Sequence, residues 1–334
     1  MTFPNLHPEH LLQLDDPAQA AALFKTSIGM VEIEVFSYCN RKCWFCPNGS
    51  SVDRISANHH MPESMYLSIL DQLASIDYAG TISYSRYNEP LADEIIVERI
   101  AQARARLPRA LLHTNTNGDY LKPDYLARLY DAGLRGLNIQ LYLANNDRYD
   151  HAKTKARAVQ TLRRVPLPSK LVRDEEGVWY ELKLEYRDMA IRMYGRNFEL
   201  NGNSRGDSVD VKRDYVRTAP CLMPFNSVYV DYNGEMVPCC NLRSDLPEHR
   251  DVVIGSLHTQ PNIFLQYTSR FASRFRHSLL NAGAKLGACA NCNFALEDLN
   301  DQRLMQMDLL RAKAYTRGAR APAAVRKPIM LVPA

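Results

Sequence analysis

Three cysteines lie close together in the first part of the chain, at Cys39, Cys43 and Cys46. Because only a few residues separate them, one short loop carries three thiols. Soft thiolate ligands favour iron–sulfur clusters, and three of them can hold three corners of a [4Fe–4S] cube. The fourth iron then has no protein ligand, and an open metal position is a place for chemistry.

The same thiols could instead hold zinc, with His59 or His60 as the fourth ligand. A C-x3-C-x2-C spacing on one loop is unusual for zinc, so we favour the iron–sulfur interpretation.

The elements around this loop predict a sheet built from repeated strand–helix units. Apolar periodicity predicts strands over residues 31–36, 81–85, 110–115, 137–142, 180–186 and 191–200, and helices over 8–25, 61–76, 93–107, 122–132 and 147–164. About six such units fit before residue 207, which favours the α/β class and a partial (β/α)6 TIM-like barrel. The cysteine loop, Asn88-Glu89-Pro90 and Asn117-Gly118 each follow a predicted strand, so we expect one common site at the carboxyl ends of the strands.

A second set of four cysteines follows later in the chain. Cys221 and Cys239 bracket a predicted hairpin whose turn is Asn233-Gly234, and Cys289 and Cys292 form a C-x2-C pair. Four thiols complete a closed site, and their spacing alone fits structural zinc as well as an iron–sulfur cluster.

The first cysteine loop resembles the cluster-binding loop of radical S-adenosylmethionine (SAM) enzymes. The resemblance implies that SAM chelates the open iron of a [4Fe–4S] cluster and yields a 5′-deoxyadenosyl radical that abstracts a hydrogen from the substrate. It also implies SAM-binding roles for Phe45 against the adenine, for Asn88, Glu89 and Pro90 at the amino group, for Asn117 at the ribose, for Gln140, where a serine is more usual, and for Arg205 at the carboxylate.

The second set resembles the SPASM or twitch extension of the same superfamily, through the order Cys221, Gly234, Cys239. This resemblance implies one auxiliary [4Fe–4S] cluster held by Cys221, Cys239, Cys289 and Cys292, on a small hairpin and helix extension. The expected organisation is an N-terminal helix (1–29), the radical SAM barrel (30–207), the auxiliary cluster domain (208–300), and a C-terminal helix with a flexible basic tail (301–334).

These cofactors favour oxidation of an alcohol-bearing small molecule, such as a sugar or aminocyclitol, with the auxiliary cluster as electron acceptor. One alternative is epimerisation with Cys240 as hydrogen donor, although Cys240 could also be a plain buried residue. Another is modification of a ribosomally made peptide, against which the short segment before Cys39 counts mildly. Each reaction needs an external one-electron reductant such as flavodoxin or ferredoxin.

Further site residues are predicted from their positions at strand ends alone. Substrate contacts are expected from Tyr84, Arg86, Tyr87, Tyr142, Tyr186 and Arg187, and the general base from Lys183, Glu185 or Asp188.

Composition is that of an ordinary globular protein. The 334 residues include 41 basic and 37 acidic side chains, and a net charge of +4 is too small to favour nucleic acid or a membrane as partner. The sequence shows neither a signal peptide nor an apolar run of membrane-spanning length. We therefore expect a cytoplasmic protein whose cysteines are metal ligands rather than disulfides.

Overall fold

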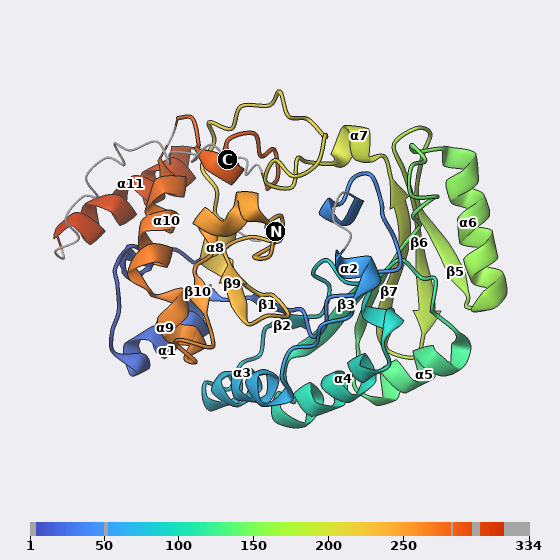
Figure 1. Ribbon diagram of the computed structural model, residues 1–334, viewed down its shortest axis with the longest axis horizontal. Helices are drawn as coiled ribbons and strands as arrows, with labels where there is room; N and C mark the ends of the chain where they lie inside the picture. The colour runs from blue at the N-terminus through green and yellow to red at the C-terminus, as the bar shows by residue number, and fades with distance from the viewer. Residues whose placement is uncertain (1–4, 50–52, 282, 296–300, 317–334) are drawn as a thin grey trace.

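The computed structural model describes residues 5–49, 53–281, 283–295 and 301–316 (Figure 1). Its strands are β1 (Met30–Ile33), β2 (Thr81–Ser83), β3 (Leu111–Thr116), β4 (Gly136–Gln140), β5 (Ser169–Glu175), β6 (Trp179–Tyr186), β7 (Met189–Arg196), β8 (Ser227–Val230), β9 (Glu235–Val237) and β10 (Gly255–Ser256). They form one sheet in the order β10-β9-β8-β1-β2-β3-β4-β7-β6-β5.

Helices cover the outer side of this curved sheet, where α3, α4, α5 and α6 lie (Figure 1). The α-helices are α1 (Pro17–Ser27), α2 (Asp53–Ser56), α3 (Glu63–Ser75), α4 (Ile95–Arg106), α5 (Pro123–Asp131), α6 (His151–Arg164), α7 (Phe198–Asn201), α8 (Met223–Asn226), α9 (Ile263–Tyr267), α10 (Arg270–Leu280) and α11 (Asp301–Thr316). Short 3-10 helices are η1 (Pro8–Leu11), η2 (Pro47–Gly49), η3 (Pro90–Ala92), η4 (Pro247–Val252) and η5 (Gly287–Cys289). Strand and helix residues such as Val31, Ile82 and Ile69 share one buried apolar cluster.

The partial barrel is confirmed, but its strands are not those expected. The parallel neighbours are β8, β1, β2, β3, β4 and β7. β6 runs antiparallel to β7, and β5 runs antiparallel to β6. The prediction of about six units before residue 207 is therefore wrong, because the two residues between β6 and β7 can close a hairpin but not a parallel crossover.

The predicted hairpin is present as β8 and β9, and Gly234 adopts a φ of +75° in its turn, which favours glycine. β8 also pairs in parallel with β1, over Met30↔Ser227 to Ile33↔Val230. The hairpin therefore belongs to the same sheet as the barrel strands. The predicted domain boundary at residue 207 does not divide the protein into two separate sheets. The domain boundaries themselves stay predictions.

Several predicted element ends are wrong. The helix expected over 8–25 is broken into η1 and α1, because Asp16 caps Ala18 N and Pro17 is favoured at the first helical position. β1 ends at Ile33, β7 ends at Arg196, and α6 begins only after its N-cap Asp150.

The C-terminal helix packs against the start of the chain. Met307, Leu310 and Ala314 of α11 are buried in a cluster with Leu11. Leu304 of the same helix is 41% exposed. The predicted flexible tail from 317 onward lies outside the described residues. Among the helices described, none is long and apolar enough to cross a membrane.

Candidate active site

The inner face of the sheet is polar, and β1 shows why. Val31 and Ile33 belong to the apolar core, whereas the alternating residues Glu32 and Glu34 point away from it, since strand side chains have a period of two. Both carboxyl groups are nevertheless buried, at 7% and 0% exposed. The alternation that predicted the strand thus places two acids inside the barrel rather than in water.

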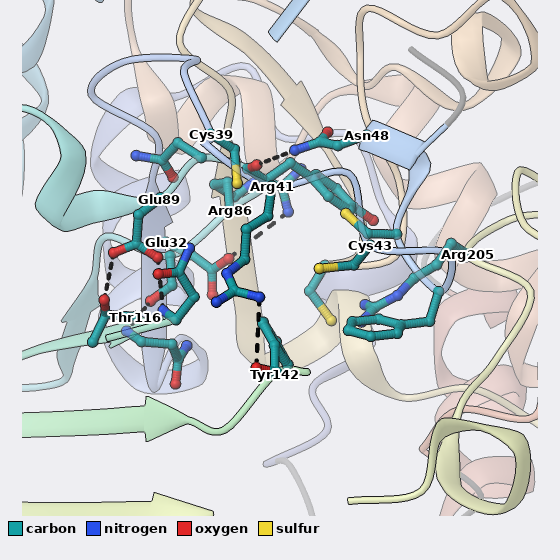
Figure 2. A pocket seen from close by; sticks show the side chains of 18 of the residues that line it. Glu32, Cys39, Arg41, Cys43, Asn48, Arg86, Glu89, Thr116, Tyr142 and Arg205 are labelled. Atoms are coloured by element: carbon teal, nitrogen blue, oxygen red, sulfur yellow. Dashed lines mark hydrogen bonds and ion pairs between the residues drawn. The ribbon is translucent and has the colours of Figure 1, made fainter. Parts of the chain in front are cut away.

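One cavity of about 270 Å³ opens above this face, at the carboxyl ends of the strands (Figure 2). Of the residues predicted for the site, its lining includes Cys39, Cys43, Cys46, Phe45, Asn88, Glu89, Asn117, Arg205 and Cys240. Gln140 and Pro90 are not among the lining residues. Gln140 accepts a hydrogen bond from the Tyr142 hydroxyl instead, and Pro90 starts η3.

The cysteine loop is held from two sides. Arg41 donates two hydrogen bonds to Asp119, at 2.7 and 2.8 Å, and a third to the Leu143 carbonyl at 2.7 Å. Asn40 also donates to Asp119, at 2.8 Å. Burial alone would raise the pKa of Asp119, but the hydrogen bonds from Arg41 and Asn40 lower it to about 2. An ionised Asp119 therefore anchors the loop to the end of β3.

Glu89 joins the cysteine loop to the turn at Asn117. Its carboxylate accepts hydrogen bonds from Asn117 N at 2.7 Å, Leu91 N at 3.1 Å and the Thr116 hydroxyl, and its own N–H donates to Tyr38 O at 2.9 Å. Burial raises the pKa of Glu89 to about 7, against the opposing effect of these bonds. Its contact with SAM stays a prediction, because the carboxylate is already used to hold the chain.

Three neighbouring residues present unsatisfied polar atoms to the cavity. Within the described chain, both amide atoms of Asn88, the Tyr87 hydroxyl and Nη1 of Arg86 are buried without a hydrogen-bond partner. Unsatisfied buried groups are costly and uncommon, so this wall fits a polar ligand. Asn88 thus contributes two unpartnered polar atoms to the cavity wall.

Phe45 lines the cavity, but one face of its ring is covered. It stacks on Phe198 of α7 at 3.6 Å between ring centroids, with the planes inclined by 4°. The predicted adenine contact therefore has only the opposite face of Phe45 available.

The four cysteines of the second set lie in one region, where Cys221, Cys239 and Cys289 share an apolar cluster with Tyr229 and Val237. Arg217, which sequence reasoning missed, is 1% exposed and ties this region together. Its guanidinium donates to the carbonyls of Pro220 at 2.7 Å and Cys292 at 3.1 Å, and to that of Phe294.

Buried ion pairs join the first cysteine region to the second. Arg86 donates to Asp231 at 2.6 and 2.8 Å, and Arg54 bridges Glu34 and Asp245. Glu34 also accepts from the backbone N–H groups of Tyr87 at 2.9 Å and Asn88 at 3.1 Å. These pairs were missed because their partners lie far apart in sequence and no local pattern marks them.

Several residues that were predicted to lie in the site, because they follow strands, do not line the cavity. Because β6 is antiparallel, its last residues and the following turn lie at the amino ends of the parallel strands, opposite the cavity. The predictions for Tyr186, Arg187, Lys183, Glu185 and Asp188 are therefore wrong. Tyr84 is also wrong, because it is buried against Tyr66 in the core. Arg86, Tyr87 and Tyr142 do line the cavity.

The histidines offered for zinc have other partners. His60 Nε2 lies 2.8 Å from Asp93 Oδ2, and the His59 ring stacks near Tyr232. In the described ranges, no three His, Cys, Asp or Glu side chains gather as they would around one metal ion. The ligands of a [4Fe–4S] cube bind four different irons, so they need not gather around one point. Cysteine thiolates are the usual ligands of such a cluster, and both cysteine sets supply them.

Family comparisons agree with this chemistry. The model of the radical SAM superfamily matches residues 33–166, and that of the SPASM iron–sulfur cluster-binding domain matches residues 221–293. The chain therefore carries a radical SAM domain followed by a SPASM iron–sulfur cluster-binding domain. Its cofactors are accordingly SAM, a [4Fe–4S] cluster for SAM, and auxiliary iron–sulfur.

Individual relatives give a finer comparison. The chain is 29% identical, over 79% of its length and 92% of the relative's, to the S-adenosyl-L-methionine-dependent 2-deoxy-scyllo-inosamine dehydrogenase of Niallia circulans. It is also similar to the crystal structure of BtrN in complex with AdoMet and 2-DOIA, with a TM-score of 0.57, 23% identity, and coverage of 82% of this chain and 96% of that one. An open conformation of BtrN gives a TM-score of 0.52 at 23% identity, with coverage of 80% and 92%. These structures support the fold.

Proposed function

We propose that this radical SAM enzyme oxidises an alcohol group of a small molecule, removing two hydrogens. The observation that carries the proposal is the position of Cys240, which follows Cys239 of the second set yet lines the same cavity as Cys39, Cys43 and Cys46. A substrate in this cavity is close to both cysteine sets. The relative that dehydrogenates an aminocyclitol supports the same reaction class.

The residues would divide the work as follows. Cys39, Cys43 and Cys46 would hold the SAM cluster, and Cys221, Cys239, Cys289 and Cys292 would hold a fully ligated auxiliary [4Fe–4S] cluster. When bound, these groups supply a radical that accepts a hydrogen atom and a sink for the second electron. Asn88 would bind SAM with its unpartnered amide atoms and Arg205 with its guanidinium, and Arg86 and Tyr87 would orient the substrate.

Oxidation of an alcohol also needs a group that accepts the hydroxyl proton. Glu32 lines the cavity, and Arg86 Nη1 lies 4.0 Å from its carboxylate. Burial raises the pKa of Glu32 to about 8, against the opposing effect of Arg86. A carboxylate with such a pKa is a suitable general base near neutral pH, so Glu32 replaces the wrong sequence candidates in our proposal.

Epimerisation is the second candidate, because the Cys240 side chain lines the cavity and could return a hydrogen atom. Product mass separates the two reactions. With 2-deoxy-scyllo-inosamine or another polyol as substrate, oxidation removes two hydrogens, whereas epimerisation in deuterated water leaves the formula unchanged but gains deuterium. A peptide substrate would give neither result and would show as peptide binding.

The cofactor assignment is tested by iron and sulfide analysis after anaerobic reconstitution. We expect about eight irons per chain in the parent and about four in a triple Cys39→Ala/Cys43→Ala/Cys46→Ala variant, since each cube holds four. The matched variant with alanine at Cys221, Cys239, Cys289 and Cys292 should also keep about four. About four irons in the parent and none in the first variant would remove the proposed electron sink.

The proposal includes an external electron donor of the flavodoxin or ferredoxin type and a cytoplasmic location. The eight cysteines all lie in the described residues and none of them forms a disulfide bond there, which fits a reducing compartment.

A further inference from the structure

Two arginines in the cavity have no acidic partner. Arg196, the last residue of β7, and Arg205 both line the cavity, and Figure 2 shows Arg205 on its Cys43 side. Among the described residues, neither guanidinium lies within ion-pair distance of a carboxylate. Arg205 donates one hydrogen bond, to Asn241 Oδ1 at 2.8 Å. The buried Nε of Arg196 has no acceptor.

The fully buried arginines of the described chain each have at least two hydrogen-bond or ion-pair partners, although one nitrogen each of Arg54, Arg86 and Arg276 lacks a hydrogen-bond acceptor. Arg54 and Arg243 pair with carboxylates, and Arg217 donates to several backbone carbonyls. Arg205 has only one such partner and the Nε of Arg196 has none, so both are less well satisfied than these arginines. Burial lowers the pKa of Arg196, and the positive charge of Arg205 acts in the same direction. Both arginines are partly buried, and two neighbouring cations with little water around them destabilise each other unless an anion lies between or beside them.

SAM can account for only one of these two charges. Its single carboxylate is assigned to Arg205 through the resemblance, which leaves Arg196 for another anion. A guanidinium forms paired hydrogen bonds with a carboxylate or a phosphate, both of which match its planar fork. The cavity also offers the polar atoms of Tyr87 and Arg86, which suit hydroxyl groups.

We propose that the substrate is an anionic polyol, a hydroxylated small molecule with a carboxylate or phosphate group that Arg196 binds. This inference rests on the proposed function, and it departs from the relative named for an aminocyclitol, an amine. The competing explanation is structural, because Arg196 lies over the Phe198 ring at 4.6 Å. That contact explains the position of the side chain but leaves its Nε without an acceptor.

Calorimetric titration of the reconstituted, SAM-loaded and unreduced protein tests the inference without turnover. The probes are glucose, glucosamine, gluconate, glucose 6-phosphate and inorganic phosphate, so the arms separate neutral, cationic, carboxylate and phosphate ligands. We expect an anionic probe to bind most tightly. Arg196→Gln should weaken that binding by roughly tenfold to a hundredfold, the usual effect of losing a charged hydrogen bond.

Arg192→Gln is the matched control. Arg192 lies on the same strand and the same face of β7 but pairs with Glu181 at 2.8 and 3.0 Å, so its loss should leave anion binding unchanged. Arg196→Lys keeps the charge and should retain part of the binding, even if the glutamine variant folds poorly.

Three results would overturn the inference. They are equal binding of neutral, cationic and anionic probes, failure of every anion to bind at millimolar concentration, and weaker SAM binding in Arg196→Gln with anion binding unchanged. Anion binding that depends on Arg196, together with a product that has not lost two hydrogens, would support this inference and refute the proposed oxidation.

Discussion

Replacing Glu34 should test whether a buried charge near this site stabilises the folded protein. Glu34 is 0% exposed, pairs with Arg54, and accepts hydrogen bonds from the N–H groups of Tyr87 and Asn88. Glu34→Gln keeps the shape but removes the charge, leaving Arg54 with Asp245 alone. Breaking a buried ion pair by removing one partner costs about 3–5 kcal/mol.

Glu235→Gln is the control for this prediction. Glu235 accepts two hydrogen bonds from Arg250, but the Arg250 side chain is 52% exposed, and such surface pairs contribute only about 0–1 kcal/mol. Urea unfolding of both variants, prepared anaerobically, measures the two losses of unfolding free energy. The double variant Glu34→Gln/Arg54→Met should be less destabilised than the sum of its single variants, by up to about 3 kcal/mol, because it leaves no unpaired charge.

The two readouts give clear grounds for rejection. Equal destabilisation by Glu34→Gln and Glu235→Gln would show that the Glu34–Arg54 pair does not hold the site. Strict additivity in the double variant would show that the two charges do not interact. We also expect Glu34→Gln to weaken SAM binding, because the Tyr87-Asn88 turn loses its anchor, whereas Glu235→Gln should not.

Three further predictions concern the cavity, its turn and the second cysteine set. If Glu32 is the base, its ionised form is the active one, so the oxidation rate should rise with pH through about 8, and Glu32→Gln should abolish this rise. The groups that act on the charge of Glu32 are Arg86, Cys240, Glu34 and Asp231. An unchanged pH profile in Glu32→Gln would exclude Glu32. Arg217→Met should lose about four irons while SAM binding persists, and a full iron content would refute the role of Arg217. Gly118→Ala should cost about 1–2 kcal/mol in urea unfolding, because Gly118 has a φ of +76° and the new Cβ would lie 3.0 Å from Ile139; an unchanged midpoint would show that the turn adapts.

Local patterns in the sequence predicted what depends on local chemistry. The cysteine spacings predicted both thiol sets, Asn233-Gly234 predicted the β8–β9 turn, and the alternation in β1 predicted a strand. What could not be predicted depends on pairs of residues far apart in the chain. Asp119 holds Arg41, and Arg217 reaches Cys292, but nothing in either local sequence distinguishes these residues from surface charges. The direction of β6 could have been predicted, since the link to β7 is too short for a crossover.

The charged side chains of the cavity wall differ in whether the protein itself supplies an oppositely charged partner. Arg86 has Asp231, and Arg41 has Asp119, so each of these charges is compensated within the protein. Glu32, Arg196 and Arg205 line the same cavity, yet the described residues offer them no close ion pair; Glu32 comes nearest, at 4.0 Å from Arg86. Folding gains nothing from burying an uncompensated charge, so such a group persists where a ligand supplies its partner. Compensated charges therefore shape the wall, and Glu32, Arg196 and Arg205 are the charges that still need a partner from a bound ligand.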